Sequence, residues 1–357
     1  MIKIALLFIH SIRVWIQSSD GGKTAHCRLL IIIGLLLISP SCMAGDAAEI
    51  VLVTWNIEHL AAEDDSGCRP RQEADYQALH AMAQSLNATI IAVQEIENAA
   101  ALARVFDPAD YELIVSERPE TRVTACRRRP RQLINPQRTG FALHRQRLAE
   151  QGLRWERLED FAEIGFSYSS LRWGTRIGLF AADDSTPMLE LMSLHLKAGC
   201  AWGALDRPQL ERAQCRTLRR QRGILEEWID DRAAAGQPFV LLGDFNRQLD
   251  QPRDDFWYDI NDGAVCDWRF DADFGRRCIP GSTRPEPNAN LTLANAGNPF
   301  PFPFNPRYPY AVDHFIFDKQ SARWIVADSY EVIEYPDQPL SDHHPLRIVM
   351  RLPRSSI

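Results

Sequence analysis

Polar side chains stand directly after short apolar segments at several widely separated places in this chain. The apolar segment 239–242 runs into Gly-Asp-Phe-Asn at 243–246, and Ser-Asp-His-His-Pro follows at 341–345. Two similar transitions occur earlier, Trp-Asn-Ile-Glu at 55–58 and Gln-Glu-Ile-Glu at 94–97. Such apolar segments are typical of buried strands, and strand ends present side chains to a cleft at the edge of a sheet. The chain must therefore fold so that several strand ends meet.

Predicted strands outnumber predicted helices. The strands are expected at 50–57, 89–94, 111–116, 139–144, 172–180, 188–196, 239–242, 312–317, 330–333 and 345–352. The helices are expected at 72–86, 99–106 and 206–232, and residues 247–310 read mostly as loops. Because many strands follow one another without an intervening helix, the pattern favours an α/β fold of two packed sheets with outer helices over a doubly wound parallel sheet. No linker divides the motifs, which indicates one domain.

The N-terminal region predicts export. Lys23 and Arg28 precede an apolar run at 29–38, which is too short to span a bilayer comfortably and is followed by small residues. We expect residues 1–44 to be a signal peptide with an upstream extension and residues 45–357 to be the mature domain, periplasmic or secreted. Acylation at Cys42, which would make a lipoprotein and add a membrane as partner, is the alternative interpretation.

The cysteines support export. Of the eight cysteines, Cys27 and Cys42 fall in the predicted leader and leave an even number in the mature chain. An even number in an exported chain indicates disulfides, and the wide spacing does not suit structural zinc. Proximity in sequence, and elimination for the remaining pair, predict three disulfides: Cys200–Cys215, Cys266–Cys278 and Cys68–Cys126.

The strand-end residues suit acid–base chemistry and a hard metal ion. Asp244 and Asn246 are two residues apart and face one side in an extended backbone, although Gly-Asp and Asn also form turns. His343 stands beside an acid and could act as a base, an acid or a phosphate ligand near neutral pH, and Asp313 could orient its imidazole. Glu95 and Asn56 offer oxygen ligands of the kind that Mg²⁺ prefers.

Positive charge is concentrated locally, although the net charge is −7. The negative total argues against a protein that coats DNA, but it does not exclude an enzyme with a basic cleft. His195 and Lys197 fall on the same side of one predicted strand, where they could contact phosphate. Arg138 ends an arginine-rich stretch at 122–138 that suits a polyanionic substrate or is simply a solvated loop, and Arg176 is a further candidate for phosphate binding.

With these motifs in chain order, the sequence resembles the endonuclease/exonuclease/phosphatase superfamily over roughly residues 50–352. The resemblance implies a four-layer αββα sandwich of two mixed sheets and a divalent cation, Mg²⁺ or else Mn²⁺ or Ca²⁺. It also implies roles for individual residues. The implied metal ligands are Asn56, Glu95 and Asp342, and the implied catalytic residues are His195, Asp244, Asn246, Asp313 and His343. Whether Asp244 or His343 is the general base stays open at this stage.

The resemblance implies a phosphodiester hydrolase, and export favours a secreted or periplasmic endonuclease acting on DNA or RNA. The pattern expected of abasic-site repair enzymes is missing around Asp313. Two alternatives remain: a phospholipid or phosphomonoester hydrolase with the same centre, and a non-catalytic binding module. Nothing in the sequence implies a stable protein partner, so we expect a monomer.

Overall fold

The fold was analysed in a computed structural model of the chain. The structure describes residues 47–120, 124–166, 171–181, 184–205, 212–261, 266–271, 275–280, 289–295, 310–336 and 338–353, and for 266–271 and 275–280 the backbone only. Residues Asp46–Ile357 form one compact unit. The predicted leader, including Cys42, lies outside the described residues. Within the described part of the chain, no helix combines the length and the apolarity needed to cross a bilayer.

The first sheet is mixed and has the order β13-β14-β1-β2-β4-β3. Its strands are β1 (Ala47–Leu60), β2 (Ile90–Ile96), β3 (Tyr111–Val115), β4 (Arg138–His144), β13 (Glu331–Val332) and β14 (Leu346–Pro353). Strand β1 pairs in parallel with β2, while all other neighbours are antiparallel. The parallel pair brings the C-terminal ends of β1 and β2 to the same edge of the sheet.

The second sheet is also mixed and has the order β11-β12-β8-β7-β6-β5. Its strands are β5 (Leu153–Phe161), β6 (Gly174–Ala181), β7 (Leu189–His195), β8 (Phe239–Asp244), β11 (Thr292–Leu293) and β12 (Asp313–Phe317). Here β7 and β8 form the parallel pair, so their C-terminal ends also lie together. Outside this sheet, β9 (Cys266–Asp271) and β10 (Gly275–Pro280) form an antiparallel hairpin.

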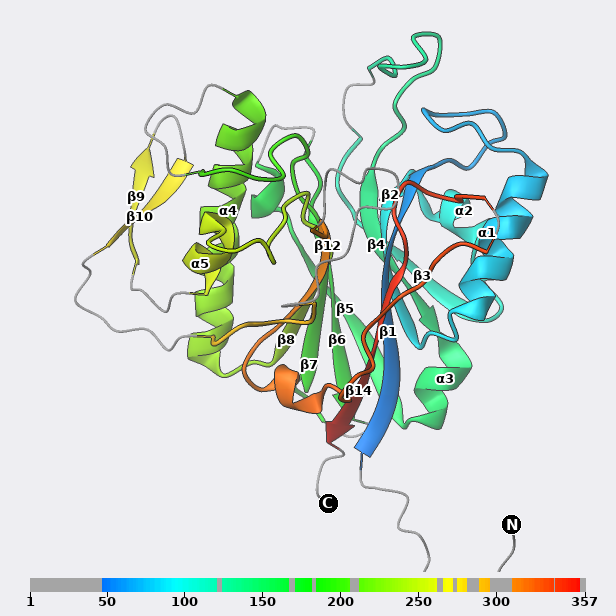
Figure 1. The fold of residues 1–357 in the computed structure, drawn as a ribbon. Coiled ribbons are helices and arrows are strands. Elements are labelled where there is room, and N and C mark those ends of the chain that lie inside the picture. The colour runs from blue at the N-terminus through cyan, green and yellow to red at the C-terminus, as the bar shows by residue number, and fades with distance from the viewer. Residues whose placement is uncertain are drawn as a thin grey trace, which may run out of the picture. The chain divides into compact units, whose positions relative to one another are not determined.

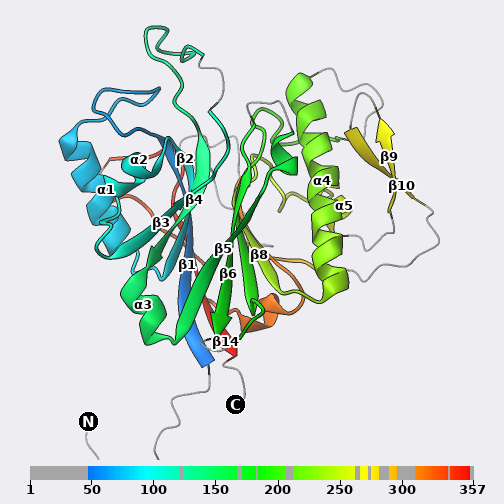
Figure 2. The same ribbon diagram turned by 180° about the vertical axis from the view of Figure 1, so that it is seen from behind.

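Three apolar clusters hold the layers together. Alternate side chains of both sheets meet in the central cluster, for example Ile50 and Phe141 from the first sheet and Leu191 and Phe315 from the second. A second cluster lies under α1 (Glu73–Ser85) and α2 (Ala99–Ala103) on the first sheet. A third lies under α4 (Ala213–Ala235) and α5 (Asp255–Ile260) on the second. The two sheets thus pack face to face between outer helices, which confirms the predicted αββα sandwich (Figures 1 and 2).

Some elements differ from the sequence-based expectation. Strand β5 was not expected, because its central residues are mostly charged and exposed at a sheet edge, where apolar alternation is weak. The short helices α3 (Arg145–Glu150) and α5, and the β9–β10 hairpin, were also not expected. Helix α5 and the β9–β10 hairpin lie within residues 247–310, which were predicted to be mostly loops. The many Gly, Pro, Asp and Asn residues of that stretch hide the pattern of short elements in the sequence.

The structure contains the disulfides Cys68–Cys126 and Cys200–Cys215. The first joins the segment after β1 to the segment before β4, and the second joins the segment after β7 to α4. The side chains of Cys266 and Cys278 lie outside the described residues, so their pairing stays a prediction.

Reduction of the mature protein is expected to lower its free energy of unfolding, by about 2–4 kcal/mol for each disulfide that is broken. Cys68–Cys126 spans 58 residues and Cys200–Cys215 spans 15. Because a longer closed loop restricts the unfolded chain more, the Cys68→Ser/Cys126→Ser variant should lose more stability than Cys200→Ser/Cys215→Ser. Urea unfolding of both variants measures this, and midpoints equal to the wild type would contradict it.

Candidate active site

The ends of the two parallel strand pairs meet at one edge of the sandwich. Asn56 and Glu95 come from β1 and β2, and His195 and Asp244 from β7 and β8. His195 is the register partner of Asp244, and Asp244 in turn is the partner of Asp313 at the start of β12. Register partners face the same side of a sheet, so these three side chains stand in a row.

Gly243 lets β8 run close against β7 at this point. Its φ is +145°, and an added Cβ would lie 2.0 Å from the backbone oxygen of Leu194. Only glycine tolerates both conditions, since the approaching atom belongs to the backbone. This explains why a glycine precedes Asp244.

Asp244 is the centre of a buried hydrogen-bond network. The side chain of this residue, which is 1% exposed, accepts hydrogen bonds from the backbone N–H of Asn246 (2.7 Å), the Asn246 amide (3.0 Å) and the Asn56 amide (3.1 Å). Burial raises the pKa of Asp244 to about 7, against the opposing effect of His343. The carboxyl group can therefore exchange a proton near neutral pH.

His343 is held by an acid on each side. Its Nδ1 lies 2.6 Å from Asp313 Oδ2, and its Nε2 lies 3.8 Å from Asp244 Oδ2. Burial alone would lower the pKa of His343, but the carboxylates of Asp313 and Asp244 raise it well above its usual value. The ring is therefore an imidazolium at neutral pH, and Nδ1–H donates to Asp313.

His195 is in the opposite charge state. Its Nε2 lies 3.3 Å from Asp244 Oδ2, while burial, followed by the positive charges of Arg172 and His343, lowers the pKa of His195 well below its usual value. The ring is therefore neutral, and its Nε2 lies beside the Asp244 carboxyl group. A protonated histidine, His343, and a neutral one, His195, thus lie on either side of the Asp244 carboxyl group.

Glu95 sits in a strained backbone conformation. Its φ is +62°, and the pairing of β2 shifts register around it, so its side chain does not follow the strand alternation. The carboxylate accepts hydrogen bonds from the backbone N–H of His59 (3.0 Å) and the Gln137 amide (2.9 Å). Although burial by itself raises the pKa of Glu95, the positive charges of His59 and Arg172 lower it, so the group is ionised.

These carboxylates suit a divalent cation. The side chain of Asp342 is only half covered, and the partial loss of water around it, together with the negative charges of Glu58 and Glu95, raises its pKa to about 6 against the opposing effect of His343. Repulsion between Glu95 and Asp342 is the kind of strain that a hard cation relieves. Asp244, Asp313 and His343 also have ligand atoms within 4.8 Å of one another. Those three residues also contact one another directly, with His343 Nδ1 2.6 Å from Asp313 Oδ2, and they form a second candidate group for a cation.

Asn56 points its amino group, and not its oxygen, at the two acids. Its Oδ1 accepts a hydrogen bond from the backbone N–H of Glu58 (3.0 Å), which fixes the orientation of the amide. Its Nδ2 donates to Asp244 and lies 3.4 Å from Glu95 Oε1. In this orientation Asn56 bridges the two sheets as a hydrogen-bond donor, and its role as a metal ligand stays a prediction.

A cleft of about 570 Å³ contains most of the residues that the sequence singled out. It is lined by Glu95, His195, Lys197, Asp244, Asn246, Asp342 and His343, and also by Gln137, Arg172, Ala198, Gly199, Cys200, Ala201, Trp202, Arg212, Gln248 and Val312. Asn56 and Asp313 lie behind this lining and contact it through hydrogen bonds.

The structure does not bring Arg176 and Arg138 to the cleft. Arg176 pairs with Glu190 at 2.8 Å and lies over the Trp228 ring, because Thr175 faces the opposite sheet and its neighbour must point outward. Arg138 donates to the backbone oxygens of Glu97 and Arg118. The prediction that these two arginines bind substrate phosphate does not fit their positions.

Arg172 is a site residue that the sequence did not reveal. It is 9% exposed, lines the cleft, and donates from Nη2 to the backbone oxygen of Leu196 (2.9 Å), while its Nε has no hydrogen-bond partner among the described residues. Arg172 stands just before β6 and belongs to no recognisable motif. It lies beside Glu95 and Asp244 only because of the way the chain folds. His59 and Gln137 were missed for the same reason.

Comparison with known proteins agrees with this architecture. A family model described as the Endonuclease/Exonuclease/phosphatase family matches residues 53–343, which is most of the chain. The chain belongs to this family, and the resemblance seen in the sequence is confirmed. The family name itself describes enzymes that hydrolyse phosphate esters.

Solved structures show the same fold at low identity. An endonuclease/exonuclease/phosphatase from Bacteroides vulgatus is 14% identical, with a TM-score of 0.51 over 85% of this chain and 99% of that one. The human Nocturnin catalytic domain with a bound sulfate anion is 14% identical, with a TM-score of 0.50 over 85% and 94%. No curated protein sequence matches this chain.

Proposed function

We propose that this protein is an exported, divalent-metal-dependent phosphodiester hydrolase that cleaves DNA or RNA internally. The observation that carries the proposal is the arrangement of His343. Asp313 holds its Nδ1 at 2.6 Å, so its Nε2 faces Asp244 and the cleft that Glu95 borders. The two disulfides support export, because such bonds persist in oxidising compartments.

In this proposal, Asp244 is the general base. A group with a pKa of about 7 is matched to neutral pH and takes a proton from the attacking water as the bond to phosphorus forms. The Asn56 amide, the Asn246 amide and the backbone N–H of Asn246 donate to its carboxyl group and hold it in one orientation. His343 cannot act as the base in this state, because its ring already carries a proton on each nitrogen.

The positive groups stabilise the charge that develops on the phosphate. The imidazolium of His343 donates from Nε2 to a phosphoryl oxygen, and the guanidinium of Arg172, which lines the cleft, adds a positive charge beside Glu95 and Asp244. Lys197 adds a further positive charge in the cleft. Glu95 and Asp342 would hold the divalent cation, which supplies Lewis-acid stabilisation of the phosphoryl oxygens when bound.

Release of acid-soluble nucleotides from duplex and single-stranded DNA and RNA tests the proposal. Purified mature protein is expected to cleave at least one of them with Mg²⁺ and to stop when a chelator is added. No cleavage of any of them, together with turnover of sphingomyelin or of a phosphomonoester, would replace it by a lipid or phosphomonoester hydrolase. No turnover of any of these substrates would favour the binding module.

Exposed arginines beside the site are expected to increase affinity for a polyanion. Arg128, Arg129 and Glu58 line a second cavity of about 430 Å³. This cavity adjoins the active site, because the Glu58 carboxylate accepts a hydrogen bond from the backbone N–H of Asp342 at 3.1 Å. The Arg128→Gln/Arg129→Gln variant should raise KM, leave kcat unchanged, and flatten the dependence of log KM on log salt by about 0.7–0.9 for each phosphate group that it no longer binds. The same measurement on Arg253→Gln, which removes an exposed arginine outside both cavities, is the control. An unchanged slope in the double variant would exclude phosphate binding by this pair.

The pH profile is expected to report the charge on His343. Because the Asp313 carboxylate raises the pKa of His343, the protonated ring persists to alkaline pH and activity falls when that proton is lost. Asp313→Asn removes the carboxylate charge, so the alkaline limb of kcat/KM should move to lower pH. The acid limb, where Asp244 becomes protonated, should remain. An alkaline limb that does not move in Asp313→Asn would contradict the protonated state of His343.

A further inference from the structure

The Cys200–Cys215 disulfide lies at the cleft and joins two segments that each carry a positive side chain. Lys197 stands three residues before Cys200, and Arg212 stands three residues before Cys215. Both cations line the cleft, and so does Cys200 itself. The bond therefore ties the loop that carries Lys197 to the segment that carries Arg212, and both segments belong to the wall of the same cleft.

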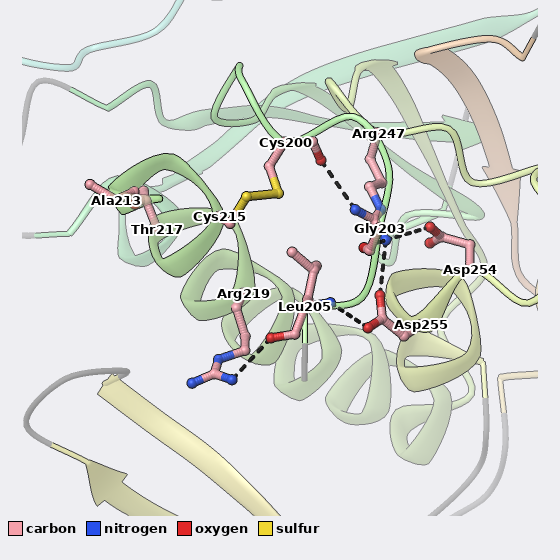
Figure 3. The surroundings of a disulfide bond; sticks show 10 residues. All are labelled: Cys200, Gly203, Leu205, Ala213, Cys215, Thr217, Arg219, Arg247, Asp254 and Asp255. Carbon is pink, nitrogen blue, oxygen red and sulfur yellow. Dashed lines mark hydrogen bonds and ion pairs between the residues drawn. A yellow bond between two sulfur atoms is a disulfide. The ribbon is translucent and has the colours of Figure 1, made fainter. Parts of the chain in front are cut away.

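The first turn of α4 depends on this bond for its contact with the rest of the domain (Figure 3). Arg212 is the N-cap residue of the helix, and Ala213 and Gln214 follow it. These three residues are exposed, whereas Cys215 is 7% exposed, and the next buried residue is Leu218. Because Cys215 is the only buried residue among the four described residues of this turn, the disulfide is what holds Arg212 beside the cleft.

The loop on the other side of the bond is weakly held between Lys197 and Cys200. Within the part of the chain that the structure describes, Ala198 and Gly199 form no hydrogen bond. Gly199 has a φ of +99°, and a Cβ added to it would lie 3.1 Å from Cγ of Gln214, so the loop touches the first turn of α4. Without the covalent bond, this contact alone would keep the two segments together.

The rest of the loop keeps its place without the disulfide. Arg247, which is 1% exposed, donates to the backbone oxygens of Cys200 (3.2 Å) and Gly203 (2.7 Å), as Figure 3 shows. The backbone N–H of Gln248 donates to the backbone oxygen of Ala201 at 2.9 Å. Breaking the disulfide is therefore a local change, and the reduced domain is expected to stay folded.

We propose that the Cys200–Cys215 disulfide is a redox switch that controls the affinity of the cleft for phosphate groups. In the disulfide form, Lys197 and Arg212 are held in one cleft. A dithiol transfers two electrons and two protons to the disulfide, becomes a disulfide itself and leaves two thiols, at Cys200 and Cys215. The first turn of α4 then separates from the loop, and Arg212 no longer contributes to binding.

This inference rests on the proposed function and adds regulation to it. Before export, the chain is in a compartment that keeps thiols reduced, and the cleft binds nucleic acid weakly there. After export, an oxidant of the disulfide type takes up the two electrons and two protons, and the bond closes the cleft into its binding form. A nuclease with this switch spares the nucleic acid of the cell that makes it.

Steady-state kinetics with Mg²⁺ on oxidised and reduced protein tests the switch. Wild type is incubated with dithiothreitol until mass spectrometry after alkylation shows free thiols at Cys200 and Cys215. Its KM for a single-stranded oligonucleotide should rise by about 10- to 100-fold, the effect of losing one hydrogen bond to a charged group, while kcat stays within about twofold. The Cys200→Ser/Cys215→Ser variant should have this higher KM with and without dithiothreitol.

Two further variants assign the effect to this bond and to Arg212. Cys68→Ser/Cys126→Ser keeps the Cys200–Cys215 disulfide, so dithiothreitol should raise its KM by the same factor as in the wild type. Arg212→Gln should raise KM in the oxidised form, and reduction should then add little, because both changes remove the same contact. An unchanged KM in the reduced wild type, or a full response in Arg212→Gln, would overturn the inference.

A binding measurement separates the switch from the proposed function. Fluorescence anisotropy of a fluorescein-labelled single-stranded oligonucleotide in chelator gives Kd for each redox state without cleavage. Reduction should raise Kd by the same factor as KM. Equal Kd values in the two states, or no binding by the oxidised form, would contradict the switch. Oxidised protein that binds the oligonucleotide but cleaves no nucleic acid with Mg²⁺ would contradict the proposed nuclease and leave the switch standing.

Discussion

Replacement of Asp244 by asparagine is expected to lower kcat by about 10²–10⁴-fold, the range that a general base contributes. The change keeps the size of the side chain and one oxygen that can accept from Asn246, but it removes the group that takes the proton from water. KM should change little, because Asp244 acts on the nucleophile and does not hold the substrate. Steady-state kinetics on the best nucleic-acid substrate measures both parameters.

The stability of the same variant separates loss of chemistry from loss of fold. Burial raises the pKa of Asp244 from 3.8 to about 7, so the ionised form is disfavoured in the folded state. This destabilisation is absent below pH 3.8 and fully present above pH 7. In the presence of chelator, the melting temperature of Asp244→Asn relative to that of the wild type should therefore be higher at pH 8 than at acid pH, where both proteins carry an uncharged group at this position.

A matched control is Asp231→Asn, which changes an exposed acid on α4 outside the cleft. It should change neither kcat nor the melting temperature. Asp244→Asn protein with near wild-type kcat would remove Asp244 from the chemistry. Variant protein that melts far lower at pH 8 would instead mean that its charge is needed for the fold.

Replacement of Glu95 by glutamine is the second change with a large expected effect. At limiting Mg²⁺ it should lower activity at least about a hundredfold, since Lewis-acid stabilisation is worth several kcal/mol and each ~1.36 kcal/mol is tenfold in rate. The reason is the loss of the ionised carboxylate at the centre of the predicted ligand group. Titration of Mn²⁺ by calorimetry should show weaker binding, and excess Mg²⁺ should restore part of the rate.

Glu97 provides the control for that change. It stands two residues further along the same motif, and its carboxylate accepts the backbone N–H of Ala62 at 2.7 Å outside the cleft. Glu97→Gln should keep wild-type metal binding and rate. If Glu95→Gln keeps the same metal binding and rate as Glu97→Gln, metal binding does not depend on Glu95.

The strand-end motifs were readable from the sequence because they are local. Each consists of an apolar run and the polar residues that follow it, and the sandwich of two sheets follows from how many such runs occur in succession. Asp244, Asp313 and His343 meet as the motifs predict. Their contacts depend only on strands ending at a shared edge, which the fold class already implies.

Other parts of the site could not be predicted, because they depend on contacts between distant segments. Arg172 has no motif, and its burial beside Glu95 appears only when β6 packs near β2. Arg176 has a favourable setting in the sequence, but strand alternation turns it away from the cleft. The orientation of the Asn56 amide depends on the backbone N–H of Glu58, which the residue types do not reveal.

The position of a bound Mn²⁺ ion tests the central claim most directly. Crystals of the mature protein grown with Mn²⁺ should show an anomalous peak bound by the Glu95 carboxylate, on the same cleft as His343. A peak bound instead between Asp244, Asp313 and His343 would contradict the assigned charge states. Full nucleolytic activity in chelator with no peak at Glu95 would contradict the metal-dependent mechanism as a whole.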